Sequence, residues 1–200
     1  HKGVAVMVTG KRKYRVLVAG ANDKLGESIA ALLPKNEYEP PVFAASVGEI
    51  RRLALESTMD LVVLNTPLKD EFGTRLALDL ADYNIAVLLM VQGDVFDQVC
   101  YKVEDYGVLT LAKPVSRQSF YTAVKLLTAM RAKMLRMEKK NQALQEKMQD
   151  IRTINRAKWL LITNLQMTED EAHYHIEKKA MNSRLSRREA AEEIIRTYDP

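Results

Sequence analysis

Polar residues that could do chemistry follow directly on short apolar runs in the first half of the chain. The run "DLVVLNT" (60–66) contains Asn65 near its end, and "VLTLAKP" (108–114) contains Lys113. Two further tails, "AGAND" (19–23) and "VQGD" (91–94), carry amide and carboxyl groups. An amide is a poor nucleophile, so Asn65 does not support covalent group transfer. Lys113 is then either a residue without a remaining role or a surface hydrogen-bond donor to Asn65.

The spacing of apolar residues explains why these tails should meet. Five short apolar runs predict strands, at 14–20, 41–47, 60–66, 85–91 and 108–114. The stretches between them have helical spacing and predict helices, at 24–34, 48–58, 73–83 and 95–106. Strands that alternate with helices predict an α/β fold with a doubly wound, five-stranded parallel sheet of the flavodoxin-like kind. Ligands of such sheets bind at the carboxyl ends of the strands, where the polar tails lie.

The second half of the chain changes character at residue 117. Residues 117–166 contain neither glycine nor proline, which predicts one long helix. Its apolar residues alternate between spacings of three and four, and Asn141 and Asn155 share their register, which is typical of a parallel two-stranded coiled coil. We therefore expect a homodimer; the alternative is a helix that packs back on its own α/β domain. The predicted dimer seam comprises Leu127, Met130, Met134, Met137, Asn141, Leu144, Met148, Ile151 and Asn155.

Two capping boxes follow the long helix. "TEDE" (168–171) and "SRRE" (186–189) predict helices at 169–183 and 187–198. With the end of the long helix, these helices would form a three-helix unit. Its inner faces are expected to carry Trp159, Leu160, Ile162, Leu165, Ala172, Ile176, Ala180, Ile194 and Ile195. The predicted domains are therefore 14–118 (α/β), 119–152 (coiled-coil linker helix) and 153–198 (three-helix unit).

The excess of basic over acidic residues lies wholly in the last third of the chain. Residues 1–130 hold 15 Lys or Arg and 15 Asp or Glu, whereas residues 131–200 hold 15 and 11. Arg187 and Arg188 lie in the first turn of the last helix, where each cation opposes the helix dipole at a cost of about 0.3–1 kcal/mol. This excess indicates an anionic partner, although a solvated helical surface is the alternative. The candidate binding residues are Arg156, Lys158, Lys178, Lys179, Arg184, Arg187 and Arg188.

Other classes of function find little support in the sequence. No stretch approaches eighteen uninterrupted apolar residues, and "HKGVAVMVTGKRK" (1–13) reads as a loose extension too short for a secretory signal. The single cysteine, Cys100, has no partner for an internal disulfide, which favours a cytoplasmic setting. His173 and His175 are two apart on a helix and point to different sides, so no metal site is expected. No cofactor and no enzymatic activity are expected.

The α/β half, over roughly residues 14–130, resembles the receiver domain of response regulators. Lys113 in "AKP" matches the receiver lysine that contacts the phosphoryl group, and the resemblance implies a cis bond between Lys113 and Pro114. Asn65 stands where the family has its phospho-acceptor aspartate. Two acidic residues that hold Mg²⁺ in receivers are replaced by Gly20 and Ala21.

Further departures affect the same predicted site. Asn22 and Asp23 follow one or two positions late, and Val91 stands in place of the family's Ser or Thr. Phosphoryl transfer needs a carboxylate nucleophile and a divalent cation, so the resemblance implies a degenerate pseudo-receiver. The rival reading is that Asp70 or Asp23 substitutes as acceptor, although Asp70 is expected to be a solvated turn residue.

The last segment, 154–195, resembles the ANTAR domain, the RNA-binding module of transcription antitermination regulators. The matching residues keep the family spacing without gaps: Ala157-Lys158, Glu171-Ala172, Ala180-Met181, Glu189-Ala190-Ala191 and Ile194-Ile195. One departure is Trp159, where the family usually has glycine. The large side chain there would alter packing or offer a stacking surface.

The ANTAR resemblance implies a non-enzymatic regulator that binds paired hairpins in a nascent transcript and prevents a terminator from forming. A parallel dimer would present two RNA-binding units to two neighbouring hairpins. The receiver-like domain would then serve as a dimerisation or sensing platform, acted on by a regulatory protein partner or a small ligand. One alternative is a DNA-binding regulator that uses the small helices as a helix-turn-helix variant. The others are a protein-partner signalling module with a receiver-like domain, and an enzyme that holds a nucleotide or phosphate in the α/β domain.

Overall fold

The computed structural model describes residues 11–21 and 23–200, so residues 1–10 of the predicted extension lie outside the described residues. The chain forms two compact units, which are described separately. The first unit ends at Met134, and the second comprises Leu135–Pro200. Helix α5 (Arg117–Leu165) contributes residues to both units. Within the described residues, no helix is sufficiently long and apolar to cross a membrane.

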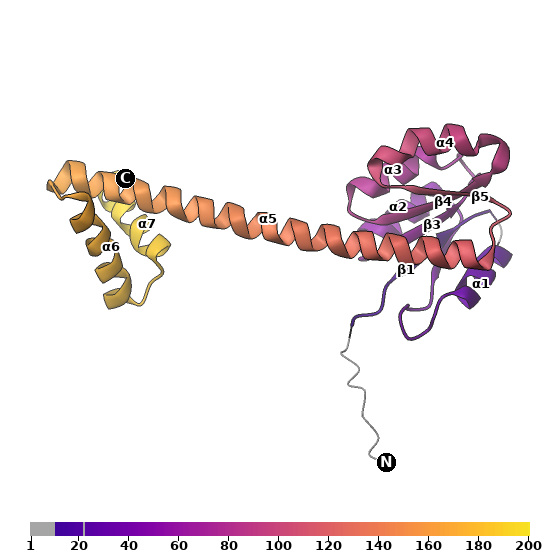
Figure 1. The fold of residues 1–200 in the computed structure, drawn as a ribbon, viewed down its shortest axis with the longest axis horizontal. Coiled ribbons are helices and arrows are strands. Elements are labelled where there is room, and N and C mark those ends of the chain that lie inside the picture. The colour runs from indigo at the N-terminus through magenta and orange to yellow at the C-terminus, as the bar shows by residue number, and fades with distance from the viewer. Residues whose placement is uncertain (1–10, 22) are drawn as a thin grey trace, which may run out of the picture. The chain divides into compact units, whose positions relative to one another are not determined.

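The first unit is built on a five-stranded parallel sheet, as the alternation of strands and helices predicts (Figure 1). Its strands are β1 (Val16–Ala19), β2 (Val42–Ala44), β3 (Leu61–Asn65), β4 (Ala86–Gln92) and β5 (Leu109–Lys113). Their order is β2-β1-β3-β4-β5, which is the flavodoxin-like order. In this register Asn65 pairs with Met90, and Gln92 pairs with Lys113, so the polar ends of β3, β4 and β5 lie at one edge.

Helices cover both faces of this sheet, which is why its strands are continuous apolar runs. The first four helices are α1 (Asp23–Leu32), α2 (Val47–Glu56), α3 (Thr74–Asp82) and α4 (Phe96–Val103). Short 3₁₀ turns, η1 (Gly93–Val95) and η2 (Glu104–Tyr106), flank α4 and occupy part of the predicted 95–106 helix. Residues of α2, α3 and α4 share one core cluster with the sheet, and α1 and the first turns of α5 share the other.

The start of α5 is part of the first unit rather than of a linker. Phe120, Val124 and Leu127 are buried against the sheet together with strand residues such as Val63. The predicted domain boundary at residue 118 is therefore too early, because these side chains complete the second layer over the sheet. For the same reason Leu127 was wrongly assigned to the dimer seam: it shares the heptad register but is buried inside its own unit.

A buried carboxylate fastens α5 to the sheet. Asp60, which directly precedes β3, is 0% exposed. Its Oδ1 lies 2.7 Å from Arg12 Nη2 and 2.8 Å from Arg131 Nη1 of α5, and its Oδ2 accepts the Arg15 backbone N–H at 2.7 Å. Arg131 also donates to the Asn84 carbonyl oxygen. The charge of Asp60 is thus compensated mainly by Arg131, whose side chain is 15% exposed, against 62% for Arg12.

The second unit packs the end of α5 against α6 (Glu169–Ser183) and α7 (Arg187–Tyr198), whose bounds are those that the capping boxes predict. The Thr168 hydroxyl accepts the Glu171 N–H at 3.2 Å, and the Glu171 carboxylate accepts the Thr168 N–H at 2.8 Å. Ser186 and Glu189 repeat the arrangement at 3.1 and 2.7 Å. Both predicted capping boxes are therefore confirmed.

Small side chains fill the core of the second unit. Its buried residues are Ala157, Leu161, Ala172, Ile176, Ala180, Ala190, Ala191 and Ile194. The inner-face prediction was right for Ala172, Ile176, Ala180 and Ile194, whereas Trp159 and Leu165 are exposed. On α5 the buried core residues are Ala157 and Leu161, each two residues from Trp159 and thus on a different side of the helix.

Replacing Asp60 should destabilise the first unit through the loss of its charge compensation. We expect Asp60→Ala to cost about 3–5 kcal/mol, because it leaves Arg131 largely buried and unpaired. Arg12→Ala should cost less than about 1 kcal/mol, because that partner is mostly exposed. Urea unfolding followed by circular dichroism measures the loss, and the fluorescence of Trp159, the single tryptophan, reports on the second unit. Equal costs for Arg12→Ala and Asp60→Ala would contradict the assignment.

Candidate functional site

Asn65 and Lys113 form a hydrogen-bonded pair at the carboxyl edge of the sheet. The Lys113 ammonium group donates to Asn65 Oδ1 at 2.9 Å and to the Thr66 carbonyl oxygen at 2.6 Å. Burial lowers the pKa of Lys113 below its ordinary value. The Lys113–Pro114 bond is cis, as predicted, and so is the Thr66–Pro67 bond. Of the two readings of Lys113, the structure shows the one in which it donates to Asn65.

The neighbours of this pair offer little to a divalent cation. A Cβ atom on Gly20 would lie 3.3 Å from Asn65 Cβ, so this position is next to the site and carries no side chain. Asn22 and the side chain of Asp23 lie outside the described residues. In the parts of the chain that are described, no group of three His, Cys, Asp or Glu side chains gathers in a metal-binding arrangement.

At the end of β4 the structure places Gln92 next to the site, whereas the resemblance to receivers had assigned Val91. Val91, the expected counterpart of the receiver Ser or Thr, is buried in the core between the sheet and its helices. Gln92 is exposed and pairs in register with Lys113, so it is the β4 residue at the site. Gln92 is the first polar residue of the tail "VQGD" and follows Val91, so the sequence already indicated it.

Asp70, the rival acceptor, has a structural partner. Both oxygens of its exposed carboxylate lie 3.1 Å from the backbone N of Val47, the first residue of α2. A carboxylate is favourable at the positive end of a helix dipole. Asp70 is thus an exposed turn residue, as expected, and it also connects the loop after β3 to the start of α2.

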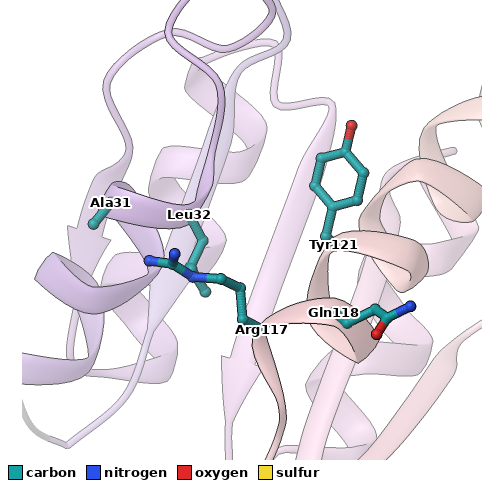
Figure 2. A pocket seen from close by; sticks show the side chains of 5 residues that line it. All are labelled: Ala31, Leu32, Arg117, Gln118 and Tyr121. Carbon is teal, nitrogen blue, oxygen red and sulfur yellow. The ribbon is translucent and has the colours of Figure 1, made fainter.

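A cavity of about 480 Å³ lies elsewhere on the first unit, between the end of α1 and the start of α5. Figure 2 shows the Arg117 guanidinium beside Leu32, while Gln118 turns away. Ala31 and Tyr121 complete the lining. Neither Asn65 nor Lys113 lines this cavity, so it is separate from the pair at the sheet edge.

Most of the predicted RNA-binding cations of the second unit are engaged in ion pairs with carboxylates of the same unit. These pairs are Arg156–Asp199, Lys179–Glu193 (3.0 Å), Arg187–Glu177 (2.7 Å), Arg188–Asp150 (3.1 Å) and Arg188–Glu192 (3.0 Å). The seven cations therefore do not form the one uninterrupted basic surface that their charge and position suggest. No ion pair is recorded for Lys158, Lys178 or Arg184 among the described residues.

Two of the predicted cations lie at a common hollow. Arg184 and Arg187 line a cavity of about 430 Å³ at the turn between α6 and α7, together with Glu177, Met181 and the apolar pair Ala180 and Leu185. Arg184 ends α6 in the left-handed backbone conformation, with φ of 54°. The structure thus brings Arg184 and Arg187 together.

Exposed apolar side chains near this hollow were not predicted as functional. Tyr174 is 65% exposed and Met181 is 78% exposed. Together with Lys178 they are spaced by four and three residues on α6, so the three lie on one face of the helix. The signal was present in the sequence, because α6 carries two apolar stripes and only one of them can face the core.

The predicted seam also remains uncovered in the single chain. The exposed large apolar residues of α5 include Met130, Met134, Met137, Leu144, Met148 and Ile151. Asn141 and Asn155, at the same heptad positions as Met134 and Met148, are exposed as well. This arrangement is typical of a helix whose apolar stripe is covered by a partner.

Comparisons with known proteins agree with this division into two parts. Residues 142–195 match the ANTAR domain family, a match that begins in α5 and ends within α7. The transcriptional regulatory protein PdtaR of Mycobacterium tuberculosis is 26% identical over 184 residues, which cover 92% of this chain and 90% of that protein.

Solved structures show what the first part resembles. The signal receiver domain of an HD domain-containing protein from Pseudomonas fluorescens Pf-5 covers 65% of this chain and 97% of its own, with a TM-score of 0.57 and 19% identity. An adenylate cyclase structure from Rhodopirellula baltica covers 66% of this chain and 98% of its own, with a TM-score of 0.60 and 14% identity. At these identities the likeness shows the fold alone. A segment that matches the ANTAR domain family therefore follows a domain with the receiver fold, an arrangement that agrees with an ANTAR response regulator.

Proposed function

We propose that this chain is an RNA-binding antitermination regulator that holds hairpins of a nascent transcript and keeps a terminator from forming. The observation that carries the proposal is the ANTAR match over 142–195, which contains all seven candidate binding cations. The relative from Mycobacterium tuberculosis is named as a transcriptional regulatory protein, which agrees with a role in transcription.

The second unit offers cations to the phosphates of a hairpin. Lys158, Lys178 and Arg184 form no ion pair with the carboxylates of the described residues, so their charge is available. Arg187 has five N–H donors, of which Nη2 faces Glu177, so the others remain for a phosphate oxygen. Contacts of this kind give affinity, and specific recognition of RNA comes from unstacked loop bases.

The receiver-like domain is a pseudo-receiver in this proposal. Asn65 cannot act as the nucleophile, and its amide oxygen already accepts from Lys113. Gly20 and Ala21 supply no carboxylate to hold Mg²⁺. The signal that acts on this domain is then a protein partner or a small ligand instead of a phosphoryl group.

Selective binding to RNA hairpins tests the central claim. We expect the full chain to bind an RNA with two adjacent hairpins more tightly than duplex DNA of equal length, in moderate salt, as measured by fluorescence anisotropy. Replacing Lys178 by Ala and Arg184 by Asn, which tolerates a left-handed backbone, should weaken binding and reduce the salt slope by roughly one for each lost phosphate contact.

The matched control replaces two exposed cations of the first unit, Arg75→Ala and Lys102→Ala, and should leave RNA affinity unchanged. Equal or tighter binding to the duplex DNA would contradict the antitermination proposal and favour the DNA-binding alternative. Binding that is only salt-sensitive, with no preference among nucleic acids, would do the same.

Dimer formation through α5 is the second expectation. Met137→Glu with Leu144→Glu should convert a dimer to a monomer in light scattering, because the charges fall on the apolar stripe. The control exchanges the charges at Lys139 and Glu146, which lie on the opposite side of the heptad and are both exposed. A wild-type chain that is monomeric at micromolar concentrations would contradict the seam.

Resistance to phosphorylation is the third expectation. Incubation with acetyl phosphate and Mg²⁺ should add no phosphoryl group to the wild-type chain, measured as intact mass. Asn65→Asp should not restore the reaction, since the carboxylates that hold the cation are still missing. A phosphorylated wild-type chain that loses the modification in the Asp70→Asn variant would overturn the pseudo-receiver assignment.

A further inference from the structure

We propose that the outer face of α6, formed by Tyr174, Lys178 and Met181, receives unstacked bases of an RNA loop, one of which enters the hollow at the α6–α7 turn. This inference rests on the proposed RNA binding and deepens it. It specifies that loop bases are recognised, and that aromatic, thioether and carboxylate side chains contact them in addition to the cations.

The two faces of α6 have different tasks. Ala172, Ile176 and Ala180 are buried in the core of the second unit. Tyr174 and Met181 lie on another side of the helix and are 65% and 78% exposed. Scattered apolar residues on a surface need no explanation, but an aromatic ring, a cation and a thioether on one helical face beside a hollow resemble a stacking platform. Bases of single-stranded RNA stack on aromatic side chains, whatever their sequence.

The hollow beside this face has the size and chemistry of a small binding site. Its volume of about 430 Å³ lies within the usual range for ligand pockets. Ala180 and Leu185 provide apolar surface, and Met181 belongs to both the hollow and the exposed face. Arg184 and Arg187 lie at the same hollow, where guanidinium planes can stack on a base or bind the adjoining phosphate.

Glu177 supplies the group that can discriminate among bases. Its Oε1 lies 2.7 Å from Arg187 Nη2 and 3.3 Å from His173 Nε2, so the carboxylate is held in place from two sides. For Oε2 no partner is recorded in the described parts of the chain. An ionised carboxylate only accepts hydrogen bonds, so it favours a base edge that donates.

Adenine, cytosine and guanine each carry an exocyclic amino group that can donate to Glu177. Uracil has no amino group, and carbonyl oxygens flank its one imino N–H, so it would bring oxygens against the carboxylate. The site should therefore disfavour uracil at one loop position. The cations around the hollow favour a polyanion over an apolar segment of a protein partner, which commits this surface to RNA.

The experiment measures the affinity of the full chain for a two-hairpin RNA and for a set of RNAs in which each loop position is changed in turn to uracil. Tyr174→Ala and Met181→Ala should each raise Kd by roughly 5- to 100-fold, and Tyr174→Phe should retain binding. The salt slope should be unchanged in these variants, because no phosphate contact is lost. Glu177→Gln should abolish the discrimination against uracil at one position.

Matched controls separate the readout of bases from folding and from general affinity. Tyr101, which is 81% exposed on α4 of the first unit, is replaced by Ala and should have no effect. The melting temperature of the variants should stay at the wild-type value, since Tyr174 and Met181 contribute little to the core.

The possible results distinguish this inference from the proposed function. Hairpin binding by wild type that persists in Tyr174→Ala overturns the α6 face and leaves the proposed function standing. Hairpin binding that is lost in Trp159→Ala but retained in Tyr174→Ala would place the bases against α5, and would also overturn the inference about the α6 face. Failure of the wild-type chain to prefer hairpins over duplex DNA removes both the proposed function and this inference.

Discussion

The buried carboxylate of Asp60 is the constraint on which the first unit and the path of α5 depend. A charge that is fully removed from water must be compensated within the protein, and Arg131 is the partner that is itself largely buried. Arg131 holds α5 against the sheet just before the first unit ends at Met134. Between this ion pair and the second-unit core, which begins at Ala157, the large apolar side chains of the predicted seam on α5 are exposed.

At the carboxyl ends of the strands, opposite to Asp60, Asn65 stands where receiver domains have an aspartate, and this amide changes the electrostatics of the site. A carboxylate beside Lys113 would form an ion pair that phosphorylation or metal binding could rearrange. Asn65 instead offers Lys113 a neutral acceptor, and this hydrogen bond forms without a phosphoryl group or a metal ion. Burial lowers the pKa of Lys113, and Asn65 brings no negative charge to oppose that shift. In the proposed function the receiver fold thus serves as a platform in which the Lys113 ammonium group is already hydrogen-bonded to Asn65 and Thr66.

Local patterns were sufficient wherever a single physical rule acts over a few residues. The bounds of α6 and α7 could be predicted because a capping box satisfies its own backbone donors. Periodicity was insufficient on α5, where one stripe meets the sheet, another is exposed and a third meets α6 and α7, so Leu127 and Trp159 were misplaced. The pairing of Arg188 with Asp150, 38 residues away, depends on how helices pack and leaves no local signal.

Those ion pairs change what the basic charge of the second unit can do. A paired arginine contributes less net attraction to a phosphate than a free one, so counting cations overstates the electrostatic part of binding. The ion pair with Glu177 also restricts the Arg187 side chain, which in the proposed complex would reduce the side-chain entropy lost on binding RNA. A surface with moderate charge and pre-ordered donors discriminates better than a uniformly basic one, because sequence-independent attraction to any polyanion is weaker. In the proposed complex, recognition of particular bases would then come from groups such as Tyr174 and Glu177.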